Sequence, residues 1–190
     1  MALHTSFETM AIEAIDEYLT ASENCLTFEK ARGGSLGYPA TLLLFWVTNA
    51  LGVYLAGESV TIGGRSQRIT EHEPFRVLNH DCFGRLALND KQIKRLEKVY
   101  RNALAHNAII DLGAVLVVRR DNGPLIFIFR PDGILINLPS FHKIVAAAWQ
   151  RFPKERIKSW AERHHKFRRE HPIFDQPRAY TPSQGSSRKR

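Results

Sequence analysis

The sequence predicts a mainly α-helical fold, a helical bundle with a small antiparallel β-meander inserted after the helix that carries the most specific motif. Three observations lead to this prediction. Apolar residues recur at helical spacing in several segments before residue 110. Three short runs of β-branched and aromatic residues follow between residues 114 and 137, separated by turn signals. A further helical stretch runs from residue 140 to about residue 170.

The first two helices are predicted at residues 7–20 and from Pro39 to about Gly57. In residues 7–20, apolar side chains recur at helical spacing and acidic side chains occupy the other face. The second segment follows a Gly-Gly-Ser break and opens with a proline. No charged residue lies between Arg32 and Glu58, so this helix is expected to be buried on most sides.

Residues 38–56 are nearly long and apolar enough to span a bilayer, which leaves a membrane-anchored protein as one alternative. The segment contains Pro39, Thr48 and Asn49, and no basic cluster flanks it. We therefore expect no stable membrane insertion.

The N-terminus has no basic region of the kind that begins a signal peptide, and the chain has only two cysteines. These features favour a reduced, cytoplasmic protein.

The best-defined helix is predicted to begin at Asn89, which can form a capping box with Gln92. Gly113 follows as a stop signal. Before this helix, residues 58–73 show no clear periodicity apart from a glycine turn, and residues 75–86 are predicted to be helical. The helix has an apolar stripe of Ile93, Leu96, Tyr100, Ala103 and Leu104, and an opposite row of Lys94, Lys98, Asn102 and His106.

Three strands are predicted at residues 114–118, 125–129 and 134–137, joined by Asp-Asn-Gly and Pro-Asp-Gly turns. The final helical stretch is interrupted at Pro153. The last residues are rich in Pro, Ser and Arg, a composition typical of disorder. The predicted organisation is a domain over residues 1–152 with the β-meander at about 114–138, a basic amphipathic helix over 153–171, and a disordered basic tail over 172–190.

The formal net charge of +8 is concentrated in the C-terminal part of the chain. Residues 151–190 contain twelve Lys and Arg against four Asp and Glu, whereas residues 1–150 contain fifteen of each. Affinity for nucleic-acid phosphates is therefore expected there, with Trp160 nearby to stack a base, although generic solvation of a basic face remains open. The candidate nucleic-acid-binding residues are Lys94, Lys98, Lys158, Arg163, Lys166 and Arg169.

The most specific motif lies between Tyr100 and Asn107. An Arg followed five residues later by a His is expected about 0.8 times by chance in a chain with 18 Arg and 8 His. Requiring an Asn directly after the Arg lowers this expectation to roughly 0.03. Arg101, Asn102 and His106 resemble the signature of the HEPN superfamily (higher eukaryotes and prokaryotes nucleotide-binding domains): an Arg, a polar residue, three variable residues and a His. The resemblance covers about residues 5–152.

The resemblance implies a metal-independent endoribonuclease that needs no cofactor and acts as a homodimer, with both motifs in one cleft. His106 would be the general acid or base, because imidazole titrates near neutral pH. Arg101 would stabilise the charge on the phosphorane, and Asn102 would orient the imidazole or the phosphate. The products would be a 2′,3′-cyclic phosphate and a 5′-hydroxyl. A role in bacterial defence or in a toxin–antitoxin pair, with an antitoxin or other protein partner, is also implied.

The spacing within the motif gives one check that is independent of the family. Residues five apart lie about 140° from each other around a helix, so Arg101 and His106 of one chain are poorly placed to grip one phosphate. This favours a composite site of two chains, or a local distortion of the helix.

Structural roles for the motif residues remain open. Arg101 can form an ion pair with Glu97, and His106 can bond to the backbone. The protein is then a non-catalytic, HEPN-like dimeric module that binds a nucleotide, a nucleic acid or a protein. Residues 71–73 and 80–82 contain potential metal ligands without a recognised spacing, so no metal site is predicted.

Overall fold

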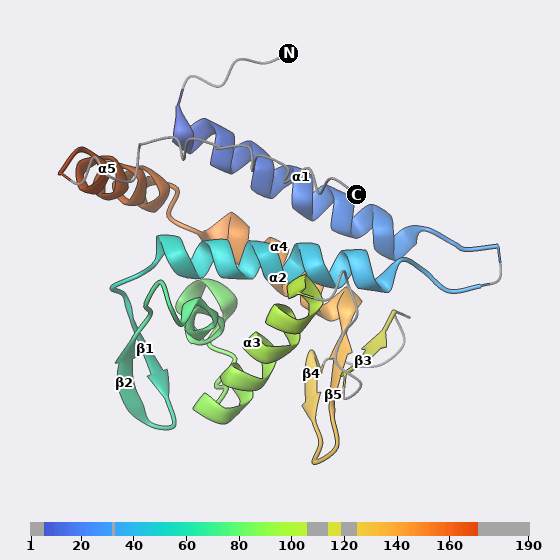
Figure 1. The fold of residues 1–190 in the computed structure, drawn as a ribbon. Helices are drawn as coiled ribbons and strands as arrows, with labels where there is room; N and C mark the ends of the chain where they lie inside the picture. The colour runs from blue at the N-terminus through green and yellow to red at the C-terminus, as the bar shows by residue number, and fades with distance from the viewer. Residues whose placement is uncertain (1–5, 32, 106–113, 119–124, 171–190) are drawn as a thin grey trace, which may run out of the picture.

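The computed structural model describes residues 6–31, 33–105, 114–118 and 125–170, and most of these residues lie in helices (Figure 1). The mainly α-helical class is therefore confirmed. The α-helices are α1 (Phe7–Thr27), α2 (Gly37–Tyr54), α3 (Asp90–Ala105), α4 (Leu138–Arg151) and α5 (Glu155–Glu170). Two 3-10 helices, η1 (Pro74–Asn79) and η2 (Asp81–Phe83), and two small sheets lie between them.

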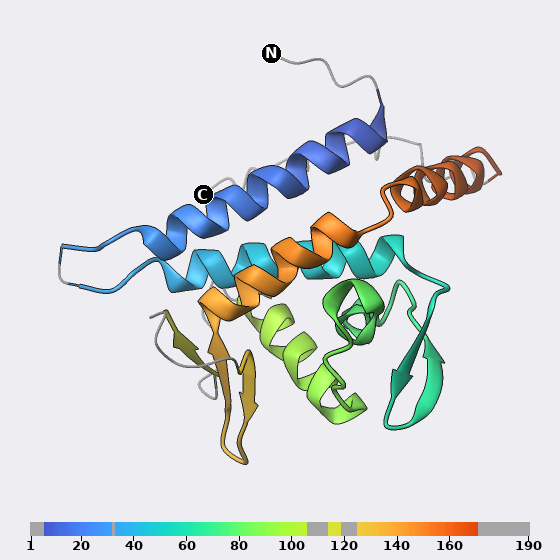
Figure 2. The ribbon, with the colours of Figure 1, turned by 180° about the vertical axis from the view of Figure 1, so that it is seen from behind.

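Helix α2 lies at the centre of the core. Helix α1 packs along it, α4 crosses it from behind, and η1 covers a further side (Figures 1 and 2). The Phe45 ring of α2 contacts the rings of Phe75, Tyr100 and Phe141, with centroids 5.6, 6.0 and 5.3 Å away. These contacts join α2 to η1, α3 and α4, so the predicted buried helix is confirmed.

The polar groups of α2 are satisfied within the helix. Thr41 and Thr48 are buried, and their hydroxyls donate to the carbonyls of Gly37 at 2.7 Å and Leu44 at 2.8 Å. Such bonds allow threonine to lie in an apolar helix without an unpaired hydroxyl.

Among the helices that the structure describes, none has both the length and the apolar character needed to cross a bilayer.

The segment before α3 differs from its prediction. Strands β1 (Ser59–Ile62) and β2 (Arg65–Arg68) form an antiparallel hairpin around two glycines with positive φ angles. The predicted helical character of residues 75–86 is confirmed only in part, because this segment forms the two short 3-10 helices η1 and η2 and not one continuous helix. The backbone of His80 between them is extended, with φ −78° and ψ 156°, and so interrupts a continuous helix.

The second sheet contains β3 (Ala114–Val117), β4 (Phe127–Phe129) and β5 (Ile134–Asn137). The predicted turn between β4 and β5 is confirmed, but the antiparallel β-meander is wrong. Strand β5 is central, antiparallel to β4 and parallel to β3. Burial explains this order: Ile134 and Ile136 of β5 are almost fully buried, whereas β3 and β4 are partly exposed at the edges.

The C-terminal helices separate at Pro153, as predicted. Phe152 is extended, with φ −67° and ψ 130°, which is the conformation favoured before proline. The Trp149 indole of α4 donates to the Asp16 carboxylate of α1 at 2.6 Å, and this bond joins the two helices. The tail that is predicted to be disordered from residue 172 lies outside the described residues.

Candidate functional site

Helix α3 carries the first part of the predicted motif, and its start is fixed by a capping box. The Asn89 side chain accepts from the Gln92 N–H at 3.0 Å, and the Gln92 side chain accepts from the Asn89 N–H at 2.9 Å. Ile93, Leu96 and Tyr100 are buried, as the apolar stripe predicts. The predicted beginning of this helix and its inward face as far as Tyr100 are therefore confirmed, whereas the side chains of Ala103 and Leu104 lie outside the described residues.

The structure places only part of the motif. The backbone of Arg101 and Asn102 lies in the last described turn of α3. Their side chains, and the whole of His106, lie outside the described residues, as does the alternative ion pair between Arg101 and Glu97. Tyr100, directly before the motif, packs its ring against Phe45 and Phe75. Burial raises the pKa of the Tyr100 hydroxyl above its ordinary value, which suits a core residue.

Asn79 is a buried side chain that fixes the position from which α3 starts. Its amide nitrogen donates to the carbonyls of Thr61 at 3.0 Å and Leu88 at 2.7 Å. Its amide oxygen accepts from the Leu88 N–H at 2.8 Å. Asn79 thus joins η1 to β1 and to the residue before the cap of α3.

Replacing Asn79 by alanine is expected to lower the free energy of unfolding by about 2–4 kcal/mol, because buried backbone groups lose their partners. Urea unfolding measures this loss. The matched control is Asn89→Ala, which removes an exposed cap and should cost about 1 kcal/mol. Equal losses in the two variants would show that Asn79 is not a structural link of this kind.

A groove lies between α3 and the β4–β5 turn, with a volume of about 630 Å³. The Arg95 guanidinium lines the groove and donates to the Arg130 carbonyl at 2.6 Å, which holds the turn against the helix. Among the lining residues that the structure describes, five are cationic and none is acidic. This α3 groove is lined by Asn89, Lys91, Gln92, Lys94, Arg95, Lys98, Phe129, Arg130 and Pro131.

The α3 groove contains two of the residues predicted to bind nucleic acid, Lys94 and Lys98, and both are exposed. Lys94 forms an ion pair with Asp90 at 2.6 Å, and this contact raises the pKa of Lys94 above its ordinary value. The opposite wall, Phe129 to Pro131, was not predicted. No local pattern connects it to α3, because Arg95 and Arg130 are 35 residues apart.

The other predicted cations lie on α5, where Lys158 and Arg163 are exposed. Lys166 and Arg169 also belong to this helix, but their side chains lie outside the described residues. Trp160, the expected stacking ring, packs instead against Phe7, Tyr54 and His164, at centroid distances of 5.4, 5.5 and 4.0 Å. The inward face of α5 is therefore used for packing.

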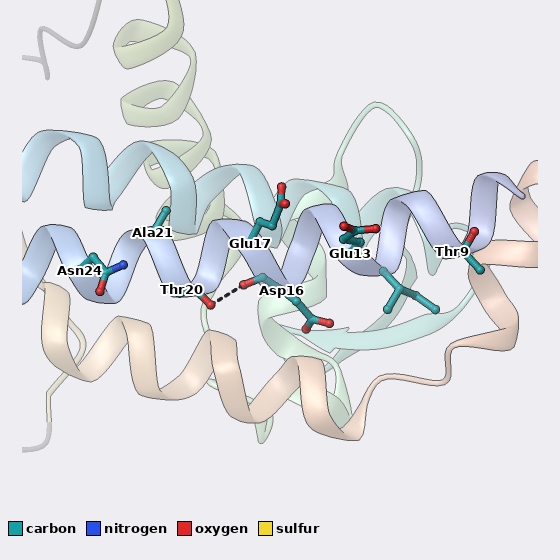
Figure 3. A pocket seen from close by; sticks show the side chains of 8 residues that line it. Thr9, Glu13, Asp16, Glu17, Thr20, Ala21 and Asn24 are labelled. Atoms are coloured by element: carbon teal, nitrogen blue, oxygen red, sulfur yellow. Dashed lines mark hydrogen bonds between the residues drawn. The ribbon is translucent and has the colours of Figure 1, made fainter. Parts of the chain in front are cut away.

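A second hollow of about 600 Å³ lies along α1 (Figure 3). Three carboxylates line it, those of Glu13, Asp16 and Glu17. Thr20 also lines it and donates its hydroxyl to the Asp16 carbonyl at 2.9 Å. Carboxylates repel phosphate groups, so the two hollows suit ligands of opposite charge.

The neighbouring His80 and Cys82 do not form a reactive pair. The His80 Nδ1 lies 3.2 Å from the Cys82 Sγ, but only 4% of Cys82 is exposed. Burial raises the pKa of the Cys82 thiol from 9.0 to about 11, so the thiol is protonated at neutral pH. Within the described part of the chain, no three His, Cys, Asp or Glu residues form a group that could hold a metal ion.

The raised pKa of Cys82 predicts a loss of stability at alkaline pH. The unfolded thiol ionises first, so the unfolded state binds fewer protons between about pH 9 and 11 and stability falls across that range. At pH 10, ionisation of this thiol in the unfolded state lowers the free energy of unfolding by about 1 kcal/mol. Urea unfolding at pH 8–10.5 under reducing conditions should show a smaller fall for Cys82→Ala than for the wild type. The control Cys25→Ala should retain the full fall, and identical pH profiles for the two variants would contradict this assignment.

Compared with protein-family models, with curated proteins and with solved structures, the chain has no match, so the likeness of its motif to the HEPN signature depends on the residues themselves.

Proposed function

We propose that this chain is a metal-independent endoribonuclease of the HEPN type that cleaves cytoplasmic RNA as a homodimer. One observation carries the proposal: the backbone of Arg101 and Asn102 lies in the last described turn of a capped helix, and Asn102 follows the exposed Lys94 and Lys98 at four-residue spacing. A helix anchored by a capping box and by the buried Tyr100 is a suitable rigid support for such a site.

In the proposed reaction, the 2′-oxygen of the substrate attacks the adjacent phosphorus while His106 accepts the 2′-hydroxyl proton. The bond from phosphorus to the 5′-oxygen breaks, and a second protonated imidazole supplies the proton to that oxygen. Arg101 stabilises the added negative charge on the phosphorane, and Asn102 orients the imidazole or the phosphate. The products are a 2′,3′-cyclic phosphate and a 5′-hydroxyl.

The dimer is part of this proposal because two chains supply the two imidazoles and relieve the unfavourable angle between Arg101 and His106. Helices α1 to α4 then correspond to the helical bundle of such a protein. A role in bacterial defence or with an antitoxin is proposed on resemblance alone.

A second candidate function is a dimeric binding module without catalysis. The observation that favours it is the α3 groove, whose described lining residues are mostly cationic and could hold an anionic ligand. Such a module would bind its ligand in this groove and would leave the ligand intact.

A cleavage assay in excess EDTA separates the two candidates. Purified wild type and His106→Ala are incubated with single-stranded RNAs of mixed sequence, and the ends of any products are analysed. The ribonuclease requires cleavage by the wild type alone, with 2′,3′-cyclic phosphate ends. Intact RNA with both proteins leaves the binding module as the better description, and equal cleavage by both excludes His106 as the catalytic group.

A further inference from the structure

We propose that the α3 groove binds single-stranded RNA, with phosphates on its cations and one base against Phe129. The inference rests on the proposed function only in its choice of RNA over DNA. The groove itself is made of described residues: one wall is the exposed side of α3, and the other is the β4–β5 turn.

The positive charge of the α3 groove lowers the stability of the protein when no ligand is bound. Lys91, Lys94, Arg95 and Lys98 recur three or four residues apart over about 10 Å of helix. Like charges at these spacings destabilise a helix by about 0.2–0.5 kcal/mol per pair. The positive end of the helix dipole disfavours Lys91, which lies in the first turn, while the Asp90 carboxylate, 2.6 Å from the Lys94 ammonium, offsets part of the positive charge. An anionic ligand would lower the repulsion that remains within the cluster.

The second wall indicates what kind of anion fits. Phe129 packs in part against the core, with its ring centroid 6.3 Å from that of Phe127, but it stays partly exposed and lines the groove together with Arg130 and Pro131. Base stacking on an aromatic ring beside a row of cations is the usual mode of binding single strands. A duplex keeps its bases stacked on each other and offers no base for such a ring. The lining therefore favours a single strand over a duplex.

The position of the α3 groove also connects it to the motif. Lys98 lies one helical turn before Asn102 on the same row. A strand held along Lys91, Lys94 and Lys98 is thus directed toward the end of α3 from which the motif begins. We infer that the groove holds the part of the RNA that flanks the cleaved phosphate.

The test compares three double variants of the full chain, each in a His106→Ala background so that the RNA stays intact. The groove variant is Lys91→Gln with Lys98→Gln. The matched control, Arg65→Gln with Arg68→Gln, removes two exposed cations of β2, on the other side of α3 from the β4–β5 turn (Figure 1). The third variant, Lys158→Gln with Arg163→Gln, tests the rival site on α5. Fluorescence anisotropy with a labelled single-stranded RNA of mixed sequence is recorded in EDTA at several salt concentrations.

The groove variant is expected to bind RNA about tenfold more weakly, because two phosphate contacts are lost. The slope of log affinity against log salt should fall in magnitude by about 1.4, since each phosphate on a single strand contributes about 0.7. Phe129→Leu should weaken binding at least fivefold through the loss of stacking, without a change in slope. The β2 and α5 variants should both match the parent protein. The matched single-stranded DNA should depend on the same groove residues.

Several results overturn the inference. Equal weakening in the groove and β2 variants would mean that net charge alone controls binding, and weakening in the α5 variant alone would move the site to α5. Binding of DNA but not RNA, or groove-dependent binding of a polyglutamate peptide without binding of RNA, would exclude an RNA site. Groove-dependent binding by a protein that does not cleave RNA overturns only the proposed function. Cleavage by a protein whose groove variants bind normally overturns only this inference.

Discussion

Replacing His106 by alanine is expected to lower the rate of RNA cleavage by about 10²–10⁴-fold, because a positioned general acid or base contributes that much. Lys94 and Lys98 lie on the exposed side of α3, and the sequence continues this row at four-residue spacing through Asn102 to His106, so we expect truncation of His106 to leave the core intact. Single-turnover rates in excess EDTA measure the effect, and thermal unfolding of both proteins confirms that the variant is folded.

Arg101 supplies the matched comparison. Arg101→Ala should reduce cleavage about 10²–10³-fold, and Arg101→Lys should recover little of it, because lysine lacks the planar pair of donors. If the site is shared between two chains, excess His106→Ala protein should lower the activity of the wild type, because a mixed dimer has only one of the two imidazoles that the reaction needs. Full activity in His106→Ala would reject the proposed catalytic role of this residue.

Replacing Gly52 by alanine is expected to cause the largest loss of stability in this chain, at least about 4 kcal/mol. A Cβ atom at Gly52 would lie 2.1 Å from the Pro74 carbonyl oxygen and 2.6 Å from the Pro74 carbonyl carbon. Both atoms are backbone, so α2 and η1 would have to separate to make room. Alanine is otherwise favoured over glycine in a helix by about 1 kcal/mol, so the loss opposes helix propensity. Urea unfolding, or a loss of folded protein on expression, measures it.

Gly37→Ala is the matched control on the same helix. A Cβ atom at Gly37 would meet side-chain ends, the Val118 Cγ1 at 3.0 Å and the Leu138 Cδ1 at 3.5 Å. These groups can shift by a few tenths of an ångström, so we expect a change of about 1 kcal/mol or less. Similar losses at the two glycines would contradict the close approach of α2 and η1.

Local signals explain which parts of the fold could be predicted from the sequence. The start of α3 depends on Asn89 and Gln92, three residues apart, and the end of α4 depends on Pro153. Pairing over longer distances gives no such signal. Strand β3 pairs in parallel with β5, 20 residues further along the chain in the register Ala114 to Ile134, and no local sequence pattern specifies this pairing. The β1–β2 hairpin buries only Val60 and Ile62, too few residues for a clear alternation.

The candidate site likewise has one part that local sequence patterns predict and another part that they do not. Lys94 and Lys98 follow from four-residue spacing within one helix, and the structure places both in the α3 groove. Phe129 and Arg130 reach the same groove only through the tertiary fold, so no pattern in the sequence identifies them. The catalytic roles of Arg101, Asn102 and His106 remain predictions from the motif.

The central position of α2 has a consequence for synthesis of the chain on the ribosome. Tyr54 ends α2 and Arg151 ends α4, so 97 residues must be added before the whole of α4 can cover α2. At 5–20 residues per second, the apolar side of α2 that faces α4 stays uncovered for roughly 5–19 s. During this interval, the nascent chain exposes the apolar, uncharged surface of α2 to other proteins. Early release or truncation before α4 should therefore produce aggregates, and chaperones that bind apolar segments should associate with α2.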